Sequence, residues 1–224
     1  PQTPNPKPQT PNPKPQNPGI VMMSSNPSVA AVLRTLREVS SEDREYTRVE
    51  YLCQMHLGSI NAKIHRVYAL NEQPSYQPVL SRYRQFLQGG RCTIMHSVIN
   101  SQDLDPITNN LPDVITRGYN TGDTGLFFPC GISTGQVSRG MGEGVMILND
   151  VAIRHTQRIL TKDISADSLY RIASSQKYDS IYVEEGGEGG EGVHPFRHNY
   201  VLMDRGQILP THIAIIRYAE TNYG

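Results

Sequence analysis

A series of short apolar runs in the second half of the sequence limits the fold more than any other feature. Each run is shorter than a typical helix, and its β-branched and aromatic residues favour strands. The gaps between the runs are irregular rather than helical in pattern. The series therefore predicts an α+β fold with a largely antiparallel sheet, not a doubly wound parallel one. The runs are GLFF (125–128), GVMILNDVAI (144–153), YDSIYV (178–183), NYVLM (199–203) and HIAIIRY (212–218).

The first half alternates between helical and strand-like spacing. A helix is expected from Asn26-Pro27, because Asn can cap a helix and Pro is tolerated at its first position. Its apolar face comprises Val29, Val32, Leu33 and Leu36. A half-buried strand is expected over 60–70, with Ile60, Ala62, Ile64, Tyr68 and Leu70 on one side. Helical spacing returns over 76–87, Gly89-Gly90 ends that helix, and RCTIMH (91–96) is expected to be a strand.

The amino-terminal segment is a proline-rich repeat with almost nothing to bury. PQTPNPK occurs twice and then decays into PQNPG, so residues 1–25 are expected to be a disordered linker and 26–224 one folded domain. Polyproline II is the expected local state. A lysine beside a PxxP spacing also makes docking to an SH3-type partner an alternative to a plain linker.

Charge and cysteine content narrow the class of partner. Lysine plus arginine equals aspartate plus glutamate at 21 each, so no net charge favours nucleic acid or a membrane surface. The three cysteines form no CxxC or Cys/His cluster with zinc-ligand spacing. An intracellular protein, nuclear or cytoplasmic, is expected. The acidic glycine run EEGGEGGEG (184–192) lacks the ligand spacing of a calcium site, so no metal is expected.

Five segments taken in order resemble the catalytic domain of poly(ADP-ribose) polymerase (PARP)-type ADP-ribosyltransferases. The likeness covers roughly residues 50–220 and is most specific at the end, in the Tyr-Val-Leu strand and the Gln-Ile-Leu-Pro turn. It implies split, mostly antiparallel sheets with flanking helices, and NAD as substrate. The segments are INAKIHRVYAL (60–70), YQPVLSRYRQFLQGGRCTIMH (76–96), ITRGYNTGDTGLFFPCGIS (115–133), KYDSIYVEEGG (177–187) and NYVLMDRGQILPTHIAIIRY (199–218).

The resemblance places a degraded histidine, tyrosine and glutamate triad on this chain. His96 matches the histidine that grips the nicotinamide ribose, and Ser97 replaces the glycine that follows it. Phe127 stands at the tyrosine position, and Asn199 stands eight residues before Gln207, where the family has its catalytic glutamate. The carboxylate that stabilises the cationic sugar is therefore absent from this position.

Two further nicotinamide contacts fall on residues that cannot make them. An ungapped match puts Gly135 at the family's serine and Ser138 at its stacking tyrosine. Removing one well-placed electrostatic stabiliser costs on the order of a hundred- to a thousandfold in rate. The combined changes predict a pseudoenzyme that acts as an interaction module for a protein partner, with lost or weak NAD binding and no polymer synthesis.

Two other activities stay open on the sequence. An active mono-ADP-ribosyltransferase, modifying proteins or nucleic acid, would use His96 with Asn199 or Glu185. A serine hydrolase would use Ser133, because GISTG (131–135) fits the G-x-S-x-G nucleophile elbow. The elbow needs a helix directly after it, and the glycine-rich QVSRGMGEG is a poor helix former, which disfavours the hydrolase.

Overall fold

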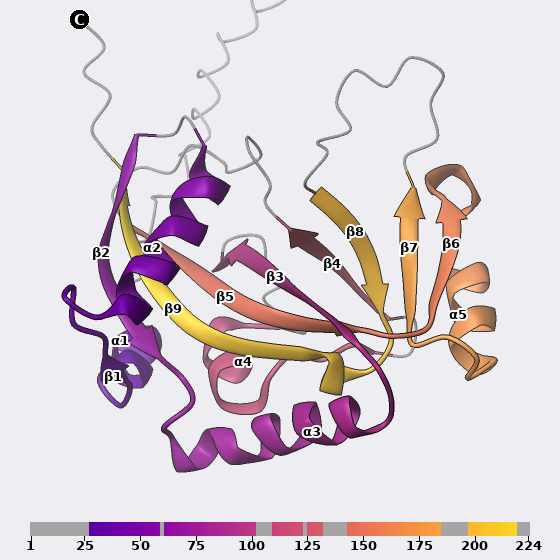
Figure 1. Cartoon of the computed structure of the whole chain (residues 1–224), viewed down its shortest axis with the longest axis horizontal. Helices are drawn as coiled ribbons and strands as arrows, with labels where there is room; N and C mark the ends of the chain where they lie inside the picture. Colours follow the sequence, from indigo (N-terminus) through magenta and orange to yellow (C-terminus); the bar gives the residue numbers. More distant parts are fainter. Residues whose placement is uncertain are drawn as a thin grey trace, which may run out of the picture.

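The fold is a nine-stranded sheet with helices on both faces (Figure 1). The computed structural model describes residues 27–58, 61–101, 109–122, 125–131, 143–184 and 197–218. The strands are ordered β1-β2-β9-β5-β3-β4-β8-β7-β6. All pairs are antiparallel except β3 with β4 and β6 with β7. The prediction of an α+β fold with a largely antiparallel sheet is confirmed.

The sheet is weakly joined in the middle. Within the described residues, which stop at 131 and resume at 143, β3 and β4 meet at one residue pair, Ser97 with Gly131, whereas the neighbouring pairs extend over six or more residues. The sheet therefore divides into a half built on β1, β2, β9, β5 and β3 and a half built on β4, β8, β7 and β6. The strands are β1 Arg37–Glu38, β2 Ala62–Ala69, β3 Thr93–Asn100, β4 Leu126–Gly131, β5 Glu143–Ile153, β6 Thr156–Leu160, β7 Ser180–Glu184, β8 Arg197–Leu202 and β9 Ile208–Tyr218.

Helices cover both faces of the first half and one face of the second. α2 lies on one face of β2, β9, β5 and β3, while α1, α3 and α4 pack against the other. α5 packs on β6, β7 and β8 at the far end (Figure 1). The α-helices are α1 Pro27–Leu33, α2 Arg44–Leu57, α3 Gln77–Gln88, α4 Leu111–Arg117 and α5 Ala166–Ser174, and the short 3₁₀ turns are η2 Pro74–Tyr76, η4 Thr161–Asp163 and η5 Arg205–Gln207.

The predicted strand over 60–70 exists as β2, but the prediction that its apolar residues share one side was wrong. Ala62 and Ile64 pack with the α2 side, whereas Tyr68 and Leu70 belong to the cluster on the opposite face. A register shift against β9 between Ile64 and Arg66 inserts one extra residue. Because side chains alternate along a strand, one extra residue moves all later side chains to the other face.

Four helices differ from the sequence prediction, among them α2, which was not predicted. The first ends at Leu33, and Leu36 is instead buried through a turn whose Leu36 N–H donates to the Leu33 carbonyl. α4 and α5 occupy gaps that were expected to be irregular. α5 begins at a reciprocal cap between Ser165 and Ser168, a signal that the polar composition of the segment concealed.

α2 also protects the outer edge of β2. β1 pairs with β2 only at Tyr68 and Ala69, so among the described residues no strand pairs with the first half of β2 on this edge, while β9 pairs with its other edge. The Tyr46 hydroxyl donates to the Ile64 carbonyl at 3.5 Å, and the Gln54 amide donates to the Ala62 carbonyl at 3.3 Å. These bonds occupy carbonyls that an exposed edge would offer to another chain.

Candidate functional site

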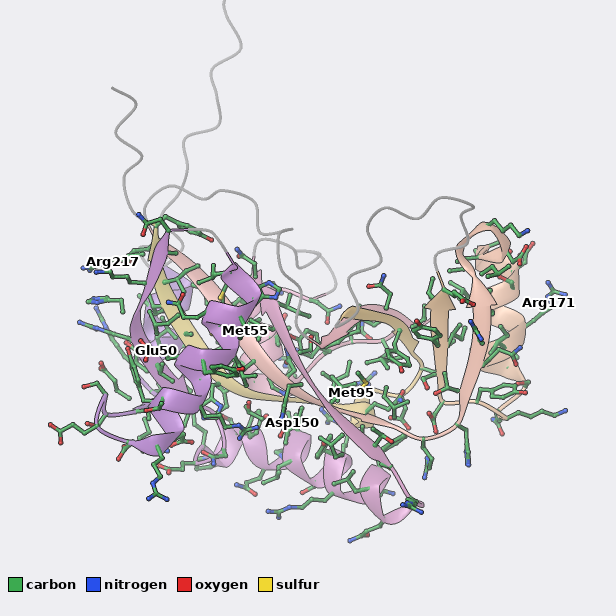
Figure 2. All side chains as sticks on the ribbon, turned by 45° about the horizontal axis from the view of Figure 1, so that its top comes forward. Glu50, Met55, Met95, Asp150, Arg171 and Arg217 are labelled. Atoms are coloured by element: carbon green, nitrogen blue, oxygen red, sulfur yellow. The ribbon has the colours of Figure 1, made fainter. Side chains whose placement is uncertain are left out.

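His96 lies on β3, on the face that α2 covers. Val98, two residues further along the strand, packs in the same cluster as α2, so His96 projects to that side. Its partner across the ladder on β5 is Asp150. Figure 2 shows Asp150 near the middle of the molecule, close to Met95, the residue before His96.

The His96 ring is held by a carboxylate and a guanidinium. Nδ1 lies 2.8 Å from Asp150 Oδ1, and because a carboxylate only accepts, Nδ1 donates this bond. Arg48 of α2 places Nη2 at 3.5 Å from both ring nitrogens and 3.7 Å from Asp150 Oδ1. The guanidinium thus lies within reach of both the imidazole and the carboxylate.

A small cavity adjoins this cluster. It is bordered by His96, Asp150, Arg48 and His212 and has a volume of about 10 Å³. A volume of this size holds about one water molecule. The His96 side chain is itself 46% exposed, so the ring can be reached from outside this cavity.

Ser97 lies on the opposite face of β3 from His96 and is 1% exposed. Its backbone pairs with Asn149 on β5 and with Gly131 on β4. The Ser97 side chain is therefore packed inside the fold and is not presented together with His96.

Asn199 lies near the start of β8, between Pro129 on β4 and Val183 on β7. Its side-chain oxygen is buried and accepts no hydrogen bond within the described part of the chain. A buried acceptor left unpaired costs about 1–3 kcal/mol. The position is thus enclosed, but the neutral amide cannot supply the charge of the family's glutamate.

The strand order brings the three triad positions onto adjacent strands. His96 is on β3, Phe127 on β4 and Asn199 on β8, and these strands are neighbours in the sheet. The Phe127 backbone pairs with Val201, while its side chain lies outside the described residues. Gly135, Ser138, Ser133 and Glu185 also lie outside them, so their predicted roles stay predictions.

The turn between β8 and β9 is built on Gln207, which is fully buried. Its side-chain oxygen accepts from the backbone N–H groups of Met203 and Asp204, both at 3.1 Å. Its amide donates to the Ala152 carbonyl of β5 at 3.1 Å. One side chain therefore fixes the end of β8 to the opposite half of the sheet, which explains why glutamine suits this position.

The sequence analysis missed the two residues that hold His96. Arg48 lies on a helix that was not predicted, although Val49, Cys53 and Leu57 are buried at helical spacing. Asp150 was visible only as a polar interruption of the apolar run GVMILNDVAI. Such an interruption in a buried strand was the available signal for a side-chain partner.

The described residues contain neither of two other kinds of site, a metal site with three or more ligands and a membrane-spanning helix. Within them, no group of three or more histidine, cysteine, aspartate or glutamate side chains is arranged to hold a metal ion. None of the helices in this part of the chain has the length and apolar character to cross a bilayer.

Comparison with known proteins identifies the fold and goes no further. No protein-family model matches the chain, and no curated protein matches its sequence. A solved structure, the crystal structure of the TASOR pseudo-PARP domain, superposes with a TM-score of 0.52 at 9% identity, covering 82% of this chain and 99% of that one. The chain therefore has a PARP-like fold, as the resemblance had suggested.

Proposed function

We propose that the chain is a pseudo-ADP-ribosyltransferase module, in which a PARP-like fold serves as a rigid scaffold for binding a protein partner. NAD binding is lost or weak, and polymer synthesis is absent. The observation that carries this proposal is the combination of residues and contacts at two of the triad positions. Asn199 replaces the carboxylate, and His96 is already bound by Asp150 and Arg48. The structural neighbour, described as a pseudo-PARP domain, is consistent with it.

The energetic argument follows from what NAD would have to displace. A ribose hydroxyl that bonded to His96 would have to displace Arg48 from the ring nitrogens. That reorganisation opposes binding before any chemistry begins. Without a carboxylate at position 199, the departing nicotinamide would also leave a cationic sugar with no counter-charge, a loss on the order of a hundred- to a thousandfold in rate.

A transfer assay tests this function. The purified chain is incubated with radiolabelled NAD beside two variants, His96→Ala and His155→Ala. His155 is a matched control because it is an exposed histidine on the turn between β5 and β6. We expect no label above background in any of the three proteins. Labelling of wild type and His155→Ala that disappears in His96→Ala would overturn the proposal.

That contradicting result would support the second candidate, a mono-ADP-ribosyltransferase. One observation favours it: the His96 ring is 46% exposed, and Asp150 and Arg48 hold its orientation. An exposed and oriented imidazole suits a hydrogen bond to a ribose hydroxyl. The transfer assay separates this candidate from the pseudoenzyme directly.

A further inference from the structure

A groove lies on the sheet face opposite α2, well separated from His96. It has a volume of about 410 Å³ and runs between α1 and strands β1, β2, β5 and β9. Ligand pockets commonly have volumes of about 300–1,000 Å³, so the groove is large enough for a ligand or a short peptide segment. Its apolar part is formed by Leu33, Leu36, Tyr68 and Ile215, which all belong to the cluster on this face.

The rim of the groove carries more basic than acidic groups. Arg66 Nε lies 3.8 Å from Glu38 Oε1, and Arg217 Nε lies 2.9 Å from Glu143 Oε1, so both acids of the rim already have a basic partner. Arg34, also on the rim, is exposed and forms no ion pair within the described residues. The uncompensated charge of the groove is therefore positive.

A histidine, neutral in the charge count at pH 7, also borders the groove. His65 lines the groove, is exposed, and likewise forms no ion pair in the described part of the chain. It follows Ile64 at the register shift in β2, where the strand departs from regular pairing. Irregularities of this kind re-aim side chains, and here the result is a basic rim above an apolar floor.

The chain's own proline-rich segment is a poor occupant. It directly precedes α1, which forms one wall of the groove, but its charged residues are Lys7 and Lys14 and it contains no acid. Placing lysines against Arg34 would bring like charges together. An acidic occupant fits the charge, and an apolar side chain fits the floor.

We propose that this groove binds an extended acidic peptide segment of a partner protein, seating an apolar side chain on Tyr68 and Ile215 and a carboxylate on Arg34. Peptide grooves commonly combine one apolar anchor with charged contacts at the rim. The proposal is independent of NAD chemistry, because the groove and His96 lie on opposite faces of the sheet.

The test uses a random-sequence peptide library displayed on phage and selected on the full chain. Enriched peptides are synthesised with a fluorescent label, and their affinities are measured by anisotropy for wild type, Arg34→Glu and Arg34→Gln. Arg171→Glu is the matched control, because Arg171 is an arginine on α5 without an ion pair among the described residues. Figure 2 shows Arg171 at the far end of the molecule from Arg217, which lines the groove.

The expected peptides combine an aspartate or glutamate with a neighbouring aliphatic or aromatic residue. Their dissociation constant should rise at least tenfold in Arg34→Glu, less in Arg34→Gln, and stay unchanged in Arg171→Glu. Binding should also weaken as salt is raised. Enriched peptides without acidic residues, or equal affinity for Arg34→Glu, would overturn the proposal. So would the absence of any enriched peptide whose binding depends on Arg34.

Discussion

Gly125, directly before β4, offers the sharpest test of how β4 packs against β8, the strands that carry the Phe127 and Asn199 positions. Its φ is +85°, a conformation that side-chain-bearing residues rarely adopt. A Cβ placed there would lie 2.6 Å from Val201 Cγ1, 2.8 Å from Met203 Sδ and 3.1 Å from the Leu202 carbonyl oxygen. The methionine sulfur can move, but the carbonyl belongs to β8 and Val201 is buried. Gly125→Ala should therefore strain β4 against β8.

The magnitude follows from two separate costs. A left-handed conformation costs a non-glycine residue about 1–2 kcal/mol. Forcing a methyl group into a packed site costs about 1–3 kcal/mol more. Gly125→Ala should thus lower the free energy of unfolding by about 2–5 kcal/mol. At about 2–4 °C per kcal/mol for a chain of this size, the melting temperature should fall by roughly 4–20 °C.

Gly122 provides a matched control for this prediction. Its φ is +61°, but a Cβ there would have no atom within 4 Å, so Gly122→Ala should incur only the conformational cost of about 1–2 kcal/mol. The assay is urea unfolding followed by far-ultraviolet circular dichroism, because the chain has no tryptophan. Equal destabilisation by the two substitutions, within about 0.5 kcal/mol, would refute the packing of β4 against β8 described above.

Three further predictions concern the buried polar and thiol groups. Gln207→Ala should lower the free energy of unfolding by about 1–3 kcal/mol in a urea titration, because it removes the acceptor of the Asp204 N–H and the donor to the Ala152 carbonyl, while the Met203 N–H keeps its bond to the Asp179 carbonyl. A loss within about 0.5 kcal/mol would contradict the bonding of that turn. Burial lowers the pKa of His212 below 6.5 despite its bond to Glu45, so the unfolded state binds more protons. Stability should then fall as the pH drops below about 6.5, and a His212→Gln variant with the same pH slope would contradict this. Burial raises the pKa of Cys53 to about 12. Iodoacetamide should therefore modify Cys92 in the native protein and reach Cys53 only after unfolding. Rapid labelling of Cys53 in the native protein would contradict its burial.

Local sequence patterns predicted the helices and strands whose apolar residues recur at a regular spacing or form a long run. α3 has apolar residues at helical spacing and glycine after its end, and its bounds, Gln77–Gln88, match the prediction closely. The long apolar runs became β5 and β9, which lie side by side in the centre of the sheet. α5 was missed because its apolar residues, Leu169 and Ile172, are few and lie among polar ones.

Long-range pairing could not be predicted from local pattern. The runs around the Gln207 turn were recognised as two strands, but β8 and β9 are not paired with each other and lie in different halves of the sheet. The side-chain reversal in β2 depends on a shift in pairing with β9, some 150 residues away in the sequence. No composition or spacing within residues 60–70 specifies that shift.

The candidate site was predicted by resemblance, but its residues are held by contacts with residues far away in the sequence. The sequence identified His96 and Asn199 through their spacing to motifs, which no periodicity would have revealed. The contacts that bind His96 come from α2 and β5, at sequence separations of 48 and 54 residues. Such contacts require the folded arrangement, because neither Arg48 nor Asp150 belongs to a recognisable motif.

The most direct test of the pseudoenzyme is a calorimetric titration of the folded chain with a non-hydrolysable NAD analogue, beside the His96→Ala variant. The proposal predicts no heat of binding up to millimolar ligand for either protein, because Arg48 and Asp150 already bind the His96 ring and Asn199 replaces the family's glutamate. Binding near micromolar to wild type that His96→Ala abolishes would contradict it and establish a working NAD site.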